Sequence, residues 1–589
     1  MRLRLRSSLF LAPAILLATT SSFAPFAKAA AQEYAMEKGE PGRPGGNLVV
    51  ALRTEPKTLN PVLSVDATSR EVIGAMNADL LHINRETQHT EPALAKSWTI
   101  SPDGRRYVLQ LRRGIKFSDG AAFTADDVVF SFQLYLDEKL HSPQRDLLIL
   151  DDKPIAVRKL GPYTVEFDLP KPYGPAERLF DGLAMMPRHI LEGPYREGRL
   201  AQMWATNSSP NEIVGLGPFR LKEYVPGQRM VLQRNPNYWK TDAKGTRLPY
   251  LSELTFVFVP NEDAQAIKFQ SGETQILERI SSDNFAVLQR EGKGKGQCME
   301  DLGPGLEFTF LFFNLNSVDP AKAPLLAAKQ AWFRNLKFRQ AVSLAVDRKG
   351  MARLVYGGRA TPIWGNVTPG NKFWMNSSLP HPERSLEQAK ILLQSSGFSW
   401  DPEGRLLDSQ KNQVSFSILV SSSNSQRTKM ATIAQDDLKQ LGMDVQVVPM
   451  EFRSLVGRIL NTKDYEAALM NLVNGDADPT PEMNLWLSSG ETHLWDLGES
   501  KPATAWEAEL DRLMQEQMVS RDYATRKKLY DRVQEIVSTN LPFIFLVSPN
   551  ILVGAQAAVG NFRPAILEPY ALWNVDQLYL RPPGAAACP

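Results

Sequence analysis

The alternation of apolar and polar positions changes period within residues 92–128. Tyr107, Leu109 and Leu111 occupy every second position between two Asp-Gly turns, which is the pattern of a half-buried strand. After Thr124 the apolar residues recur at helical spacing, and Asp127 stands three residues on, where it completes a capping box. The segment therefore predicts a strand, a turn and then a helix.

Other apolar runs predict the remaining elements. FRLKEY and MVLQR flank the Pro226-Gly227 turn and predict a hairpin, and residues 48–56 predict a first strand. SFSILV, a helix over residues 428–441 and VQVVPM form a strand, helix, strand unit typical of a parallel sheet. Further predicted elements are strands over residues 254–259 and 310–316, helices over 263–270 and 525–539, and the apolar run FIFLV.

The first 29 residues carry the pattern of a secretory signal peptide. Arginines at positions 2, 4 and 6 precede an apolar run over residues 9–17, and Ala27-Lys28-Ala29 forms an A-x-A cleavage pattern. A membrane anchor is the alternative, but the run falls short of the roughly 20 residues that cross a bilayer. No cysteine follows the run for lipid attachment, so we expect a protein free in the periplasm. Residues 30–46, rich in Gly, Pro and charge, predict a flexible leader.

Charge and cysteine content narrow the class further. The chain has 67 Lys and Arg against 65 Asp and Glu, and four of the basic residues lie in the signal peptide, which leaves 63. A nearly neutral mature chain gives no electrostatic reason to expect nucleic acid or an anionic membrane as a partner. The two cysteines are Cys298 and Cys588, and an oxidising periplasm permits a disulfide between them without requiring it.

The sequence shows no constellation typical of an enzyme. The six histidines lack a short metal-binding spacing, and G-x-S-x-G, P-loop and dinucleotide-binding motifs are absent. The acidic pairs Asp126-Asp127 and Asp436-Asp437 are neighbours in helical sequence and do not face each other as the carboxyls of a glycosidase must. We therefore expect no catalytic residues, no metal site and no cofactor.

The stretch from Pro92 to Val128 reads PALAKSWTISPDGRRYVLQLRRGIKFSDGAAFTADDV and resembles the signature of the family 5 extracellular solute-binding proteins. These proteins are the oligopeptide, dipeptide and nickel receptors of ABC importers. GLGPFRLKEYVPGQRMVLQRNPNYW and LKFRQAVSLAVDRKGMARLVYGG resemble two further motifs, in family order. The resemblance covers nearly all of residues 47–575. It implies an α/β, periplasmic-binding-protein-like fold, with two lobes built from three domains with mixed sheets and a hinged ligand cleft.

The same resemblance implies how the chain divides. Domain I takes residues 47–79, 213–306 and 544–589, the last with a C-terminal tail, while domain II takes residues 80–212 and domain III takes residues 307–543. Length supports more than one domain independently. The 589 residues less a 29-residue signal peptide leave 560, and a single core serves roughly 100–200 residues.

By this resemblance, two segments carry ligand contacts. Residues 65–67 follow the turn at Asn60-Pro61, where the first lobe of the family touches ligand, and residues 471–478 match the third-domain strand and loop that pair with it. Trp364, Trp374 and Trp486 are candidates for an aromatic wall, although single tryptophans more often pack in a core. The predicted ligand-binding residues are Val65, Asp66, Ala67, Trp364, Asn471, Leu472, Val473, Gly475, Asp476 and Asp478.

The second segment departs from the peptide receptors. Where those resemble GWxxDxxDP, with the first Asp binding the peptide amine, this chain has Leu472 and Gly475. Asp476 lies one residue on, which in an extended strand turns the side chain to the opposite face, although a loop could bring it back. Two interpretations stay open: Asp476 and Asp478 contact the ligand, or they shape the turn before Pro479.

These observations predict a periplasmic receptor that captures a solute and delivers it to the permease subunits of an ABC importer in the inner membrane. A short oligopeptide is the leading ligand, and other amine-bearing or sugar-like solutes come next. We expect a monomer with no nucleic-acid partner and no covalent chemistry. The rival hypotheses are a receptor that presents ligand to a membrane sensor and a secreted hydrolase.

Overall fold

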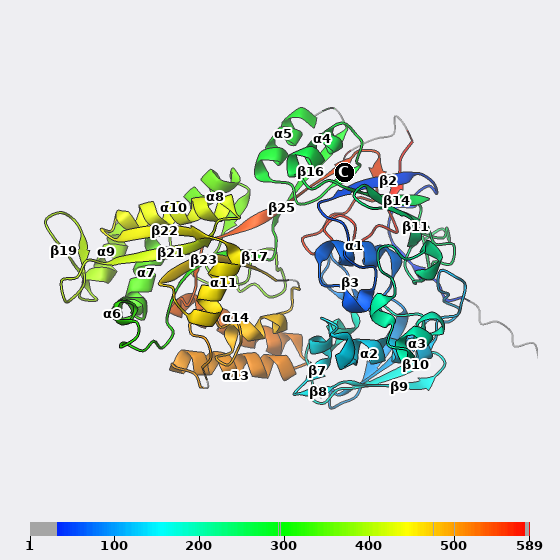
Figure 1. The fold of residues 1–589 in the computed structure, drawn as a ribbon, viewed down its shortest axis with the longest axis horizontal. Helices are drawn as coiled ribbons and strands as arrows, with labels where there is room; N and C mark the ends of the chain where they lie inside the picture. The colour runs from blue at the N-terminus through cyan, green and yellow to red at the C-terminus, as the bar shows by residue number, and fades with distance from the viewer. Residues whose placement is uncertain are drawn as a thin grey trace, which may run out of the picture.

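The computed structural model describes residues 32–292, 294, 296–474, 476–499, 501–582 and 588, so the predicted signal peptide lies outside the described residues. Two lobes lie side by side (Figure 1). We call residues 32–304 and 548–582 the first lobe and residues 307–547 the second lobe, because buried apolar side chains form one large cluster in each. Among the described residues, no helix combines the length and apolar character that a bilayer crossing requires.

The upper part of the first lobe is a mixed sheet with the strand order β11-β12-β14-β2-β15-β25-β16. The predicted hairpin is confirmed as β11 (Phe219–Val225) and β12 (Arg229–Arg234). The predicted first strand is β2 (Asn47–Leu52), which pairs in parallel with β14 (Glu253–Phe258). β15 (Ile276–Leu277), β16 (Gln297–Pro304) and β25 (Val547–Gln556) complete the sheet. Segments from three distant parts of the chain thus meet in one sheet.

The lower part of the first lobe is an antiparallel sheet with the order β5-β6-β10-β9. Its strands are β5 (Ala95–Ile100), β6 (Arg106–Leu111), β9 (Ala156–Gly161) and β10 (Thr164–Asp168). Helix α2 (Ala125–Leu136) covers it, with Phe132 packed 4.9 Å from Phe167 between ring centroids. The predicted capping box is confirmed. Asp127 Oδ2 accepts a hydrogen bond from the Thr124 amide, and the Thr124 hydroxyl accepts one from the Asp126 amide.

The second lobe is built on a sheet with the order β22-β21-β23-β17-β24. The predicted parallel unit is confirmed by β21 (Ser415–Ser421), α10 (Ser425–Lys439) and β22 (Asp444–Met450). β17 (Glu307–Phe313) runs antiparallel to both β23 (Ala467–Val473) and β24 (Ile544–Phe545). Helices α7 (Leu336–Ala345), α8 (Arg348–Tyr356), α13 (Ala505–Val519) and α14 (Tyr523–Asn540) pack around the sheet (Figure 1).

The chain passes between the lobes twice, from β16 to β17 and from β24 to β25. The two passages run close together, because β25 pairs with β16 in the first lobe and with β18 (Ala360–Pro362) in the second. Two adjacent connections allow two lobes to move about a common axis. The predicted domain boundaries near these passages stay a prediction.

The segment expected as a flexible leader is held against the first lobe from residue 32 onward. β1 (Ala35–Met36) pairs in parallel with β13 (Lys240–Thr241), and Glu33 forms an ion pair with Lys96 at 2.8 Å. The described part of the leader is therefore ordered, because backbone pairing supplies contacts that its composition does not indicate. A disulfide joins Cys298 to Cys588 and ties the end of the chain to β16.

Candidate functional site

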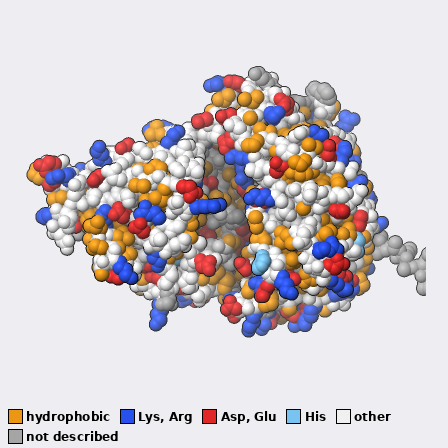
Figure 2. Space-filling model, in the orientation of Figure 1, with side chains coloured by type: hydrophobic (Ala, Val, Ile, Leu, Met, Phe, Trp, Pro, Cys, Tyr) orange, Lys and Arg blue, Asp and Glu red, His pale blue; other side chains and the backbone are white. Residues whose placement is uncertain are grey.

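A hollow separates the two lobes on the face shown in Figure 2. On the side of the second lobe, polar groups gather where β17 and β23 end their pairing. Asn471 Nδ2 donates to Glu307 Oε1 at 3.0 Å, and the guanidinium of Arg427, near the start of α10, donates to Asn471 Oδ1. Burial raises the pKa of Glu307, and Arg427 opposes the shift. These side chains form a fixed polar wall at the ends of two neighbouring strands.

The facing wall of the first lobe is richer in carboxylates. Glu71 lies in helix α1 (Ala67–Met76), and Glu278 follows β15 directly. Glu278 Oε1 accepts a hydrogen bond from the Ala571 amide at 2.5 Å, and the Arg279 guanidinium forms an ion pair with Glu568. We call Glu71, Glu278 and Glu568 the cleft carboxylates; with Arg279 they carry a formal charge of −2.

The electrostatics of the cleft carboxylates are unusual. Burial and then the neighbouring Glu278 raise the pKa of Glu71 well above its ordinary value. Burial also raises the pKa of Glu278 to about 7. Glu71 Oε1 is buried and has no hydrogen-bond partner among the described residues. A cation placed here would stabilise both ionised carboxylates, so the wall is prepared for a positively charged group.

Arg279 connects the two walls. Its positive charge lowers the pKa of Glu71 in the first lobe and that of Glu307 in the second, against the larger raising effect of burial. Arg279 therefore lies within electrostatic reach of a carboxyl in each lobe. Its backbone has a φ of 53°, in the left-handed region that non-glycine residues rarely adopt. A strained backbone at such a position is common where a side chain must be aimed at a ligand.

Lower in the cleft the lobes touch each other. Arg178, in the 3₁₀ helix Ala176–Phe180 of the first lobe, forms an ion pair with Asp476 of the second. Burial raises the pKa of Asp476, and Arg178 opposes this shift. Next to it, Asp478 accepts two hydrogen bonds from the guanidinium of Arg526, at 2.8 and 2.9 Å. Burial alone would raise the pKa of Asp478, but the pair with Arg526 holds it below its ordinary value.

Backbone groups reinforce this contact between the lobes. The Gly174 amide donates to the Met518 carbonyl at 2.6 Å, and Arg521 Nη1 donates to the Ser101 carbonyl at 3.0 Å. A side chain at Gly174 would collide with the Ser520 carbonyl, 2.3 Å from an added Cβ, so glycine permits the close approach. The structure therefore represents a state in which the lower parts of the lobes have met.

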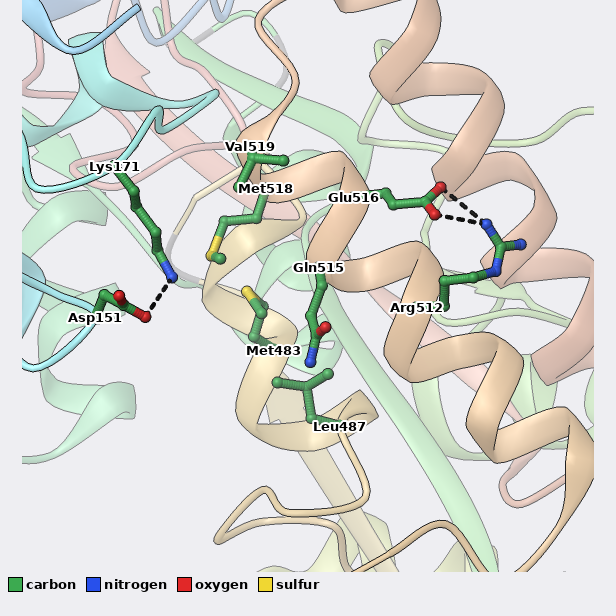
Figure 3. Close-up of a pocket in the computed structure, with 9 residues that line it drawn as sticks. All are labelled: Asp151, Lys171, Met483, Leu487, Arg512, Gln515, Glu516, Met518 and Val519. Atoms are coloured by element: carbon green, nitrogen blue, oxygen red, sulfur yellow. Dashed lines mark hydrogen bonds and ion pairs between the residues drawn. The ribbon is translucent and has the colours of Figure 1, made fainter.

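A pocket of about 600 Å³ lies beside this contact (Figure 3). In Figure 3, Lys171 and Asp151 of the first lobe form an ion pair on one side. The side chains opposite them come from the second lobe: the apolar Met483, Leu487, Met518 and Val519, and the polar Arg512, Gln515 and Glu516. Methionine is flexible and polarisable, so such a wall adapts to apolar groups of different shapes.

The three residues of the first predicted ligand segment differ in exposure and in their contacts. Val65 is 63 % exposed, and its carbonyl accepts a hydrogen bond from Arg70. Asp66 is the N-cap of α1, accepting from the Ser69 amide at 2.9 Å and from its hydroxyl at 2.7 Å, and Ala67 is the first helical residue. The Asp66 carboxylate is therefore used to start α1, the helix that carries Glu71.

The residues of the second predicted segment lie in different surroundings. Asn471 belongs to the polar wall, Leu472 packs against the core of the second lobe, and Val473 is 56 % exposed at the end of β23. Gly475 lies outside the described residues. Asp478 pairs with Arg526 of the second lobe and lies 3.8 Å from Arg178 Nε of the first, and Asp476 pairs with Arg178, so both carboxylates are engaged in this state.

The tryptophans pack within the second lobe. Trp364 stacks on His381 with ring centroids 4.6 Å apart, and the guanidinium of Arg348 lies over its ring. Trp374 and Trp486 are buried, the first beneath the guanidinium of Arg526 and the second donating to Glu482 at 2.5 Å. A ligand role for Trp364 stays a prediction, while Trp374 and Trp486 are core residues.

The structure has two lobes with a polar, carboxylate-rich cleft between them, and comparison with known proteins identifies the family. Residues 89–493 match the family described as bacterial extracellular solute-binding proteins, family 5 Middle. The chain belongs to this family. Its members are solute-binding proteins of ABC transporters rather than enzymes, and they act in the periplasm or outside the cell.

Three relatives illustrate the range of the family. A probable ABC transporter-binding protein of Deinococcus radiodurans is 27 % identical over 91 % of this chain and 92 % of its own length. The oligopeptide-binding protein AppA of Bacillus subtilis is 24 % identical over 87 % and 88 %, and the periplasmic alpha-galactoside-binding protein of Rhizobium meliloti is 28 % identical over 81 % and 71 %. The solved structure of AppA with a nonapeptide has a TM-score of 0.66, covering 92 % of this chain and 100 % of AppA, which shows a common fold.

Several residues of the site were not predicted from the sequence. They are Glu71, Arg178, the adjacent Glu278 and Arg279, Glu307 and Arg427, from five separate segments. Glu307 and Glu278 each stand next to a buried apolar strand, which is a weak signal for a charge at a strand end. The others lie in helices or loops with no local pattern that separates them from surface charges.

Proposed function

We propose that this protein captures a short oligopeptide with a free amine in the periplasm and delivers it to the permease of an ABC importer. The observation that carries the proposal is the unpartnered side-chain oxygen of Glu71, set beside Glu278, whose charge together with burial raises the pKa of Glu71. An ammonium group placed there would form charge-assisted hydrogen bonds worth roughly 1.5–3 kcal/mol each. The protein performs no covalent chemistry of its own.

The pocket beside Lys171 supports a peptide rather than a small amine alone. Its methionines adapt to varied apolar side chains, and its volume of about 600 Å³ lies within the usual range of ligand pockets. The similarity to the oligopeptide-binding protein AppA points the same way. The N-terminal export pattern supports the periplasm as the location. Membership of the family supports an ABC transporter as the partner.

The proposed anchor differs from the one that the peptide receptors' motif indicates. Asp476 is paired with Arg178, so a ligand amine at that position would have to displace a guanidinium. The guanidinium nearest to Glu71 and Glu278 is that of Arg279; it forms its ion pair with Glu568, and its charge only partly offsets the effect of burial on the pKa of the two carboxyls. We therefore place the ligand amine at the cleft carboxylates.

Native mass spectrometry of gently purified protein tests the proposal. A retained solute with the mass of a short peptide, released on denaturation and identified by fragmentation, is the expected result. A retained sugar, or a protein that binds galactosides but none of a set of di- to pentapeptides, would contradict it. Recovery of an added peptide unchanged after long incubation separates binding from hydrolysis.

A further inference from the structure

A second polar cluster lies in the connection between α12 (Met483–Trp486) and α13 of the second lobe. His493 is fully buried, with 0 % of its surface exposed. Its Nδ1 lies 3.1 Å from the Leu485 carbonyl and donates to it, which orients the ring. Nε2 has no hydrogen-bond partner among the described residues. A buried, unpaired ring nitrogen is unfavourable in a folded protein, which calls for an explanation.

Nε2 points toward carboxylates. Glu507 Oε1 lies 3.8 Å away, too far for a hydrogen bond, and Glu507 is 2 % exposed. Ligand atoms of His493, Glu499 and Glu507 all lie within 4.8 Å of one another. The lone pair of a neutral ring nitrogen and those of a carboxylate oxygen repel each other at this range, and a cation bound between them would remove the repulsion.

No basic side chain in the described part of the chain supplies that cation. Asp496 adds a third carboxyl, which is buried, and Arg334 acts on it electrostatically, with no ion pair between the two among the described residues. A second cluster of similar composition in the first lobe offers a contrast: Asp79, His82 and Asp181 also approach one another. There Arg85 pairs with Asp181 at 3.3 Å, so the positive charge is part of the protein.

We propose that His493, Glu499 and Glu507 bind a divalent transition-metal ion of the Zn²⁺ class. Zn²⁺ bonds nitrogen and carboxylate oxygen at about 2.0–2.2 Å, which places tetrahedral donors roughly 3.3 Å apart. Separations of 3.8 and up to 4.8 Å reach that value with small side-chain rotations. A water molecule or Asp496 would complete the coordination.

Hydrogen bonds from neighbouring groups fix the orientation of the proposed ligands, as is usual for metal ligands in proteins. The Nδ1 bond to Leu485 fixes the orientation of the His493 ring. Glu507 is held by Trp495 Nε1 at 3.0 Å and by the Thr504 hydroxyl at 2.7 Å, which leaves its lone pairs directed at the cluster. The ion would fasten the connection to α13, so its role is structural and independent of the ligand cleft.

The test uses untagged, full-length protein that has been treated with a chelator. Added Co²⁺, a spectroscopic substitute for Zn²⁺, is expected to give visible ligand-field absorption that saturates at one ion per chain. Zn²⁺ should displace it and raise the melting temperature. Glu499→Gln, a half-buried position that leaves the core intact, and His493→Gln should each weaken Co²⁺ binding about 10-fold or more.

Asp79→Asn in the first-lobe cluster is the matched control and should leave Co²⁺ binding unchanged. Absence of the absorption band, or binding that persists unchanged in Glu499→Gln, would overturn the proposal. If His493→Gln fails to fold, the Glu499→Gln result alone decides.

Discussion

Arg178 in the first lobe and Asp476 in the second form an ion pair that joins the lobes at the lower end of the cleft. Only 17 % of the arginine side chain and 24 % of the aspartate side chain are exposed, so water screens the pair incompletely. The aspartate nearest in sequence to the expected amine anchor thus bonds to the protein itself. Its role in this state is to hold the lobes together.

Removing this pair should favour the open form. For Arg178→Ala we expect the equilibrium between touching and separated lobes to shift by about 10-fold, which corresponds to roughly 1.4 kcal/mol. Small-angle X-ray scattering of the ligand-free protein should show a larger radius of gyration. Arg158→Ala, which removes pairs with Glu166 and Asp168 inside the first lobe, is the control and should leave the scattering unchanged. Equal scattering from both variants and the wild type would contradict a bridging role.

The neighbouring pair of Asp478 and Arg526 should matter for stability instead. Both side chains are buried within the second lobe, and Arg526 also bonds Gln517 and lies over the Trp374 ring. Asp478→Ala leaves an unpaired buried guanidinium, and we expect a loss of about 3–5 kcal/mol in the free energy of unfolding. Asp476→Ala, at a more exposed pair, should cost about 1 kcal/mol. Urea unfolding compares the two, and equal losses would argue against the distinction.

The raised pKa of Glu278 predicts a pH dependence. Because the folded pKa of about 7 exceeds the ordinary value of 4.5, the native state binds the extra proton between these values. This contribution to stability is fully present below about pH 4.5 and is lost as the pH rises toward 7, by roughly 1–3 kcal/mol in all. Glu278→Gln should flatten that decline in unfolding experiments. A decline of the same size in wild type and variant would assign it to other groups.

The disulfide predicts a further stability difference. Cys298 and Cys588 are 290 residues apart, and cross-linking distant residues restricts the unfolded chain. The double variant Cys298→Ser with Cys588→Ser should lose roughly 2–5 kcal/mol, measured as a lower melting temperature. The wild type under reducing conditions should match the double variant. An unchanged melting temperature in both would show that the end of the chain contributes nothing to stability.

Local patterns in the sequence were sufficient for much of the fold. The capping box at Thr124, the hairpin around Pro226-Gly227 and the parallel unit around α10 each depend on neighbours within a few residues. Motif resemblance supplied the two-lobed arrangement. Short-range patterns of this kind determine elements, because caps, turns and periodicity act within one element.

The candidate site could be predicted only in part. Asn471 lies in β23 and its ligand role stays a prediction, while its partners Glu307 and Arg427 come from other segments. The Arg178 and Asp476 pair spans 298 residues, and no local pattern announces a contact at that separation. The role of Asp476 depends on its ion pair with Arg178, which only the fold reveals. The sequence alone therefore leaves both interpretations of Asp476 open.

The central claim is that Glu71 and Glu278 bind a ligand amine, and isothermal titration calorimetry tests it most directly. A peptide that binds the wild type should lose affinity about 10-fold or more when its amino group is acetylated, and about as much in Glu71→Gln. The control is Glu383→Gln, which removes an exposed ion pair with Lys349 and lies far from the cleft carboxylates in sequence. The account predicts that acetylation has little further effect in Glu71→Gln. Equal affinities for free and acetylated peptide in the wild type would contradict it.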